Sequence, residues 1–173
     1  MGSFGTKLVK GWQQLENLYR ANFQRVYNYA YYSLLNSSEA EDVTSAVFVK
    51  VVANIDKFDA SRASFGTWVT RIAHNVLVDY YRTRKTTVPI ENVVVDEPSV
   101  EDDYPVLDDR QQRAAKLLSC LSAEDRELVY LKYYQEKKNV EIAQLLDMNP
   151  STVATRLRRA LITMRACAEE ETS

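Results

Sequence analysis

Residues 139–165 read NVEIAQLLDMNPSTVATRLRRALITMR, and this stretch decides the fold. Its pattern predicts a helix over residues 141–146, a tight turn, and a second helix that begins at Pro150. Asn149 can cap the second helix through its side-chain oxygen, and Pro150 suits the first helical position, which needs no N–H donor. Asp147 stands in the turn, where Asp tolerates a left-handed backbone better than most residues. The stretch is typical of a helix-turn-helix that reads DNA.

The second of these helices has an apolar face and a polar face. Apolar residues recur at three- and four-residue spacing, namely Val153, Leu157, Ala160, Leu161 and Met164. The polar face carries hydroxyls and guanidinium groups, which can bind phosphates and guanine edges in a major groove. The expected DNA-contacting residues are Ser151, Thr152, Thr155, Arg156, Arg158 and Arg159. The alternative is an ordinary amphipathic helical hairpin whose arginines only keep a surface soluble.

The composition is that of a soluble globular protein, with 46% hydrophobic and 27% charged residues among 173. Only four glycines are present, and Gly2, Gly5 and Gly11 are three of them, so we expect helices rather than glycine turns. The formal net charge of −2 argues against a strong free-standing binder of nucleic acid, because counterion release needs a concentrated positive surface. DNA binding must therefore come from segregated charge or through a partner.

Several classes of protein are disfavoured by what the sequence lacks. No apolar run approaches the length of about 20 residues that crosses a bilayer, and no signal peptide is evident, so we expect a cytoplasmic protein without membrane insertion. Cys120 and Cys167 are far apart and His74 is the only histidine, so we expect no metal site, no cofactor and no disulfide framework. Neither a nucleophile–base pair nor a glycine-rich phosphate loop stands out, so we expect no catalytic residues and no enzyme.

The predicted fold class is all-α, with two small helical domains joined by an acidic linker. The domains span residues 1–85 and 110–173, and the linker spans residues 86–109. No basic residue falls between Lys85 and Arg110, while acidic residues and three of the four prolines do. Such a composition predicts an extended, mobile linker.

Apolar spacing predicts the remaining helices. They run from Leu15 to Ala30, from about Ser38 onward with Ser38 as the cap, and over residues 67–85, 111–121 and 123–134, with Ser122 capping the last. We expect His74 on a helix surface, and Asp79 with Arg82 in an intrahelical ion pair. Phe58 and Phe65 are expected to pack at the ends of a connecting loop.

Three segments resemble a bacterial RNA polymerase sigma factor of the extracytoplasmic-function (ECF) class. They are EAEDVTSAVFVKV at 39–51, FDASRASFGTWVTRIAHNVLVDYYRTRK at 58–85, and LSAEDRELVYLKYYQEKKNVEIAQLLDMNPSTVATRLRRA at 121–160. The likeness runs from about Leu15 to Met164, with an acidic linker where that class has one. It implies an N-terminal domain that docks on core polymerase and opens the minus-ten element, and a C-terminal domain that reads the minus-thirty-five element.

The resemblance also implies roles for residues of the N-terminal domain. Polymerase docking falls to Asp42, Ser45, Ala46 and Val49. Ser45 and Ala46 stand where the class usually has a glutamine and an acid, which leaves less polar contact for an arginine-rich clamp. The minus-ten element falls to Asp59, Ser61, Arg62 and Ser64, in a loop like one that captures a flipped base, and to Asn75 and Arg82. In the C-terminal domain, Ala154 departs from the class, where a basic residue is usual.

The implied partners are core RNA polymerase, through its clamp helices and flap, promoter DNA, and an anti-sigma factor. Two alternatives from other classes stay open. One is a free-standing helix-turn-helix regulator that binds operator DNA alone. The other is a helical sigma-like decoy that holds a regulator and never starts transcription, a reading that Ser45 and Ala46 keep open.

Overall fold

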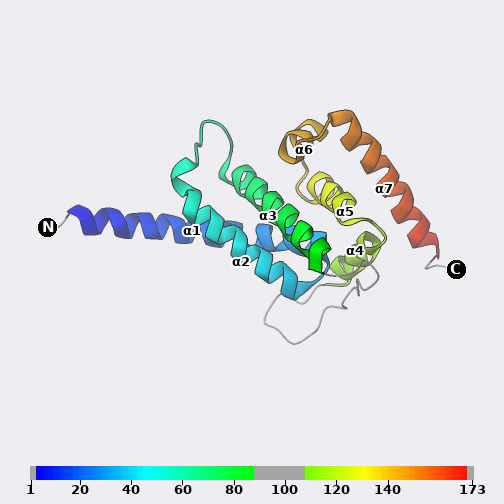
Figure 1. The fold of residues 1–173 in the computed structure, drawn as a ribbon, viewed down its shortest axis with the longest axis horizontal. Helices are drawn as coiled ribbons and strands as arrows, with labels where there is room; N and C mark the ends of the chain where they lie inside the picture. Colours follow the sequence, from blue (N-terminus) through cyan, green and yellow to red (C-terminus); the bar gives the residue numbers. More distant parts are fainter. Residues whose placement is uncertain (1–2, 88–107, 171–173) are drawn as a thin grey trace.

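The computed structural model describes residues 3–87 and 108–170. Within these ranges every regular element is a helix, so the all-α prediction is confirmed (Figure 1). The elements are α1 Ser3–Leu34, α2 Ser37–Asn54, η1 Ile55–Lys57, α3 Phe65–Thr87, α4 Asp109–Ser119, α5 Ala123–Val129, η3 Tyr130–Tyr134, α6 Asn139–Leu146 and α7 Pro150–Glu170. Among the described helices, none has the length and apolar character that crossing a bilayer requires.

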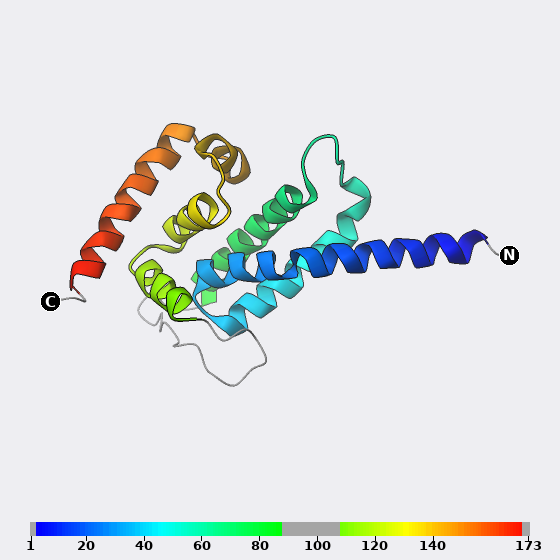
Figure 2. The same ribbon diagram turned by 180° about the vertical axis from the view of Figure 1, so that it is seen from behind.

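Helices α1, α2 and α3 pack together as the N-terminal unit. Its core is formed by buried apolar side chains from all three helices, including Val26, Ala30, Val43, Val47, Val69 and Leu77. Helix α1 is much longer than the apolar spacing predicted, and its N-terminal part projects beyond the other two helices (Figure 1, Figure 2).

The start of α2 differs from the expectation. Leu35 adopts a left-handed backbone with φ 54°, which ends α1 in a tight turn. The next residue, Asn36, is extended, and its side-chain oxygen accepts a hydrogen bond from the N–H of Glu39 at 2.9 Å. Asn36 is therefore the cap, and the predicted cap Ser38 lies inside the helix. Both are good capping residues, and the tight turn selects the earlier one.

The C-terminal unit contains α4 to α7. Ser122 caps α5 as predicted, accepting from the N–H of Asp125 at 3.2 Å. Helix α4 begins at Asp109, two residues earlier than predicted, because Asp108 and Gln111 form a reciprocal capping box. The predicted helix over residues 123–134 is regular only to Val129, after which the chain winds through the π-helical turn η3.

The helix-turn-helix prediction is confirmed in its local details. Asp147 follows α6 with φ 54° and ψ 48°, the left-handed conformation expected at the turn. Asn149 accepts a hydrogen bond from the N–H of Ser151 at 3.0 Å, and α7 begins at Pro150. Helix α6 starts at Asn139, two residues before the predicted start.

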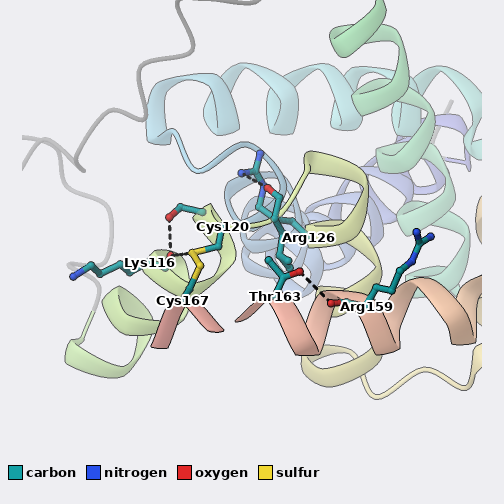
Figure 3. The surroundings of a disulfide bond; sticks show 8 residues. Lys116, Cys120, Arg126, Arg159, Thr163 and Cys167 are labelled. Atoms are coloured by element: carbon teal, nitrogen blue, oxygen red, sulfur yellow. Dashed lines mark hydrogen bonds between the residues drawn. A yellow bond between two sulfur atoms is a disulfide. The ribbon is translucent and has the colours of Figure 1, made fainter. Parts of the chain in front are cut away.

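The two cysteines contradict the expectation that the chain has no disulfide. Cys120, the residue that ends α4, is bonded to Cys167 near the end of α7 (Figure 3). Their Cα atoms are 6.8 Å apart although 47 positions separate them in the sequence. The fold brings the last turns of α7 against α4, a contact that sequence spacing cannot reveal.

The two units also pack against each other, which the two-domain prediction did not include. Helix α5 and turn η3 contact α1, and α6 contacts α3. The ring of Tyr130 lies 5.7 Å from that of Tyr29 and 5.6 Å from that of Tyr32, measured between centroids. Of the predicted linker, residues 88–107 lie outside the described residues, while 86–87 belong to α3 and 109 to α4.

Candidate nucleic-acid interface

Helix α7 exposes most of the residues predicted to contact DNA. Val153, Leu157 and Ala160 are at most 5% exposed and fix the helix on the core of the C-terminal unit. The opposite side is open to solvent and carries Ser151, Thr152, Thr155, Arg158 and Arg159. Two of these hydroxyls donate within the helix, from Thr155 to the carbonyl of Ser151 and from Ser151 to the side chain of Asn149. Their oxygens can still accept hydrogen bonds.

Arg156 is placed differently from the other five. Its guanidinium donates to the carboxylate of Asp125 at 2.8 Å and to that of Glu124 at 3.0 Å, both in the first turn of α5. Burial by itself would lower the pKa of Arg156, but these hydrogen bonds raise it. The side chain is 22% exposed. Arg156 therefore fastens α7 to α5, and its contact with DNA stays a prediction.

A groove beside the exposed face of α7 is lined in part by cationic side chains that were not predicted from the sequence. It has a volume of about 480 Å³ and is lined by Lys132, Tyr133, Asn139, Ala154, Leu157, Arg158, Leu161, Ile162 and Arg165. Arg165 follows Arg158 by seven residues, so helical periodicity could have found it. Lys132 comes from η3, and no local signal pointed to it. Leu161 was expected in the apolar stripe but is 42% exposed.

A second basic surface lies between α2 and α3. A cavity of about 310 Å³ is lined by Lys50, Asn54, Lys57, Trp68, Arg71, Ile72 and Asn75, and we call it the α2–α3 groove. It brings the predicted contact residue Asn75 beside three cations and an indole ring. Arg71 lies one helical turn before Asn75, which the sequence shows. Lys50 and Lys57 come from the preceding elements α2 and η1 and become neighbours of Asn75 only in the fold.

Hydrogen bonds to its own side chains hold the loop before α3 in shape. The carboxylate of Asp59 accepts from the N–H and the hydroxyl of Ser61 at 2.9 and 2.6 Å, and these bonds lower the pKa of Asp59. Ser64 caps α3 by accepting from the N–H of Thr67 at 3.2 Å. Arg62 is exposed between them. As predicted, Phe58 and Phe65 pack against each other at the ends of the loop, with centroids 5.3 Å apart.

Arg82 forms the ion pair with Asp79 that the spacing predicted, at 3.0 Å. Asp79 also accepts from Lys50 at 3.3 Å, so it links α3 to α2. The side chain of Arg82 is 79% exposed, and a surface pair of this kind contributes roughly 0–1 kcal/mol. The pair is therefore a weak one, and contact of Arg82 with DNA stays a prediction.

The residues implied in polymerase docking form one stripe on α2. Asp42, Ser45, Ala46 and Val49 are all exposed and follow helical spacing, while Val43 and Val47 between them are buried. Val49 is 69% exposed and the nearby Val52 is 48% exposed. The stripe thus has one carboxylate at its N-terminal end, the small side chains of Ser45 and Ala46 in the middle, and the apolar side chain of Val49 at its other end.

Both basic surfaces lie in parts of the chain that match known protein families. Residues 18–87 match Sigma-70 region 2, and residues 111–164 match Sigma-70 region 4. The ECF RNA polymerase sigma factor SigW of Bacillus subtilis is 30% identical over 154 residues, which cover 82% of this chain and 81% of SigW. SigK of Mycolicibacterium vanbaalenii is 31% identical over 149 residues, covering 83% and 76%.

Two solved structures share the fold. One is the sigma factor RpoE of Bartonella quintana in complex with the anti-sigma factor NepR, with a TM-score of 0.71 and 20% identity, covering 91% of this chain and 98% of RpoE. The other is CnrH in complex with the cytosolic domain of CnrY, with a TM-score of 0.65 and 20% identity, covering 92% and 90%. Sigma factors are DNA-binding initiation factors and not enzymes. By sequence and by fold, the chain belongs to the ECF RNA polymerase sigma factors.

Proposed function

We propose that this chain is the subunit that directs core RNA polymerase to its promoters, with region 4 reading the minus-thirty-five element and region 2 the minus-ten element. The observation that carries the proposal is the pairing of two separate basic surfaces with the two matched regions. One is the exposed face of α7 in region 4, and the other is the α2–α3 groove in region 2. Because positive charge is gathered on these two surfaces, a chain of net charge −2 can still bind DNA.

Helix α7 suits duplex DNA. A helix about 10–12 Å across fits a major groove about 12 Å wide. Arg158 and Arg159 are exposed on it and can form bidentate hydrogen bonds with guanine or salt bridges with phosphate. Arg156 holds the helix against α5 through its hydrogen bond to Asp125.

The α2–α3 groove suits single-stranded DNA, the form that an opened minus-ten element takes. Lys50, Lys57 and Arg71 can follow a phosphate backbone, and Trp68 offers an aromatic face in the same groove. Stacking of a base on an aromatic ring contributes about 1–3 kcal/mol. Asn75 supplies an amide that can hydrogen-bond a base edge. The loop around Arg62, held in shape by Asp59 and Ser64, lies just before this surface in the chain.

The exposed stripe on α2 is the proposed docking face for core polymerase. Because Ser45 and Ala46 offer little polar contact, docking depends on the apolar side chains of Val49 and Val52. Burial of apolar area contributes about 25 cal/mol per Å². These residues therefore support docking through an apolar face rather than a charged one, and substitutions on this face are expected to weaken docking.

The same family supports an anti-sigma factor as a partner and the cytoplasm as the site of action. RpoE was solved with the anti-sigma factor NepR bound and CnrH with the cytosolic domain of CnrY bound, and both share the fold of this chain. A subunit of RNA polymerase works where the polymerase and the chromosome are. Promoter DNA, core polymerase and one anti-sigma protein are therefore the proposed partners.

Run-off transcription tests this function. Purified core polymerase is given a promoter library with and without the chain, and start sites that share two upstream elements are expected only with it. The double substitution Arg158→Ala and Arg159→Ala should abolish them, while Arg113→Ala, an exposed arginine on α4, should not. Binding to core polymerase without initiation would favour the decoy. Tight duplex binding without polymerase would favour the free-standing regulator.

A further inference from the structure

One buried carboxylate lies at the centre of the contact between the two regions. Glu127 on α5 accepts a hydrogen bond from the hydroxyl of Tyr29 on α1. The same oxygen of Glu127 lies 2.7 Å from Nδ1 of His74 on α3. The side chain of Glu127 is 9% exposed and that of His74 is 17% exposed. We call these three residues the Glu127 latch.

Further contacts surround the latch on both sides. Arg126 Nε donates to the carbonyl of Ser33 at 3.0 Å, and the hydroxyl of Tyr81 donates to the same carbonyl at 3.1 Å. Asn28 donates to the hydroxyl of Tyr134 at 2.8 Å. Buried apolar side chains of the two regions form one continuous cluster. Helices of the C-terminal unit accordingly lie alongside α1 and α3 (Figure 1, Figure 2).

The chemistry of a buried carboxylate makes this contact specific. Removing an ionised carboxylate from water is costly unless hydrogen bonds and opposite charge replace the water. Glu127 belongs to region 4, whereas Tyr29 and His74 both belong to region 2. The carboxylate therefore has these partners only while the two regions are docked in this one arrangement, and it must return to water when they separate.

The docked arrangement cannot span a promoter. The minus-ten and minus-thirty-five elements lie about 25 base pairs apart, which is roughly 85 Å of DNA at about 34 Å per turn of 10 base pairs. Domains of this size have a radius of gyration of roughly 11–12 Å, so two domains in contact have centres roughly 30 Å apart. The regions must separate before both elements can be bound.

We propose that the free chain rests in a closed state held by the Glu127 latch, and that opening of this latch is a required step before promoter binding. The functional consequence rests on the proposed function, because it supposes that both regions bind DNA. The closed state itself is a property of the free chain and is testable without DNA or polymerase.

Two variants separate the latch from general destabilisation. The double variant Tyr29→Phe and His74→Leu leaves Glu127 buried without its partners. The triple variant Tyr29→Phe, His74→Leu and Glu127→Met removes the same hydrogen bonds but replaces all three residues of the latch with apolar side chains of similar volume. Exchanging a whole buried polar cluster for apolar groups is often neutral or stabilising, whereas removing the partners of a buried carboxylate is not. Opening is therefore expected in the first variant and not in the second.

Small-angle X-ray scattering of the full chain provides the measurement, and circular dichroism confirms that both variants keep their helices. The wild type and the triple variant should give a single-peaked pair-distance distribution, and the double variant a second maximum at longer distance. A two-peaked distribution for the wild type would overturn the closed resting state. A compact double variant, or a triple variant that opens equally, would overturn the role of the buried carboxylate.

Transcription assays connect opening to function. With core polymerase, the double variant should reach half-maximal initiation at a lower concentration than the wild type, because it does not have to open first. Unchanged or raised half-maximal concentration in an open variant would overturn opening as the required step. Absence of initiation by the wild type would instead overturn the proposed function and leave the scattering result standing.

Discussion

The carboxylate of Glu127 on α5 lies 2.7 Å from Nδ1 of His74 on α3, a residue 53 positions earlier in the chain. His74 is the only histidine, and the sequence placed it on a helix surface. That prediction is wrong because α5 covers this part of α3 and leaves the side chain 17% exposed. The pair is part of the contact that joins the two regions, so substitutions around it are expected to affect stability as well as opening.

The first prediction concerns Tyr29, the other partner of Glu127. Tyr29→Phe removes the hydroxyl that donates to Glu127 and should lower the free energy of unfolding by about 1–3 kcal/mol, because a buried acceptor loses a donor. Urea denaturation followed by circular dichroism measures this. Tyr31→Phe is the matched control, since Tyr31 is also buried in α1 but its hydroxyl is not bonded to the carboxylate. Equal losses in both variants would contradict the specific role of Tyr29.

The second prediction separates Arg156 from its neighbours on α7. Arg156→Ala should lower the free energy of unfolding by about 1–2 kcal/mol, because it leaves Asp125 and Glu124 without their shared partner in a partly exposed site. Arg159→Ala should leave stability unchanged and weaken binding to minus-thirty-five DNA. Thermal melting and DNA binding by the holoenzyme measure the two effects. Arg156→Lys should restore little, because an ammonium cannot form the same forked contact.

Some parts of the structure could be predicted from the sequence, because they depend on residues that are close together in the chain. The helix-turn-helix was predictable because Asp147, Asn149 and Pro150 act within one turn of their own position. Most of the face of α7 followed from helical periodicity, and the residues of the exposed stripe on α2 followed from the family resemblance. The cap of α2 was predicted wrongly, because a turn at Leu35 decides between two good capping residues.

The largest unpredicted features depend on contacts between distant positions. Arg156 meets Asp125 across 31 positions, and Glu127 meets His74 across 53. The disulfide joins positions 47 apart. Periodicity shows which side of a helix is polar, but not which other helix will cover it. The packing of one region on the other therefore required the structure.

The third prediction concerns the disulfide. Reduction should lower the free energy of unfolding by about 2–4 kcal/mol, because the bond closes a loop between positions 47 apart and removes conformations from the unfolded chain. The loss of stability should be greatest at the end of α7, where Cys167 is bonded to Cys120 (Figure 3). Denaturation with and without a dithiol reductant measures it. The double variant Cys120→Ser and Cys167→Ser should match the reduced wild type and be indifferent to reductant.

The fourth prediction is a loss of stability at alkaline pH. Burial raises the pKa of Tyr32 to about 12, and burial together with Glu127 raises the pKa of Tyr29 well above its usual value. The folded chain therefore holds these protons more tightly than the unfolded chain, whose tyrosines titrate near pH 10. The stabilisation is complete below about pH 10 and is lost as pH rises through the folded values.

Urea denaturation at a series of pH values, with phenolate absorbance recorded in parallel, tests this dependence. The midpoint should be level below about pH 10 and should fall above it. Tyr32→Phe should reduce the slope of that fall, because it removes one of the protons that the folded state holds. An equal slope in the variant would show that Tyr32 does not contribute.

The fifth prediction tests the α2–α3 groove as a surface for single-stranded DNA. Arg71 is exposed in this groove beside Asn75 and Trp68, and Arg71→Ala should weaken binding of a minus-ten oligonucleotide by the holoenzyme. Because one phosphate contact is lost, the slope of log affinity against log salt should become shallower by about 0.7. Arg113→Ala on α4 is the control, since it removes the same charge from outside the groove. A loss of affinity with an unchanged salt slope would mean that Arg71 does not contact phosphate. Equal effects of Arg71→Ala and Arg113→Ala would mean that the assay reports net charge rather than the groove.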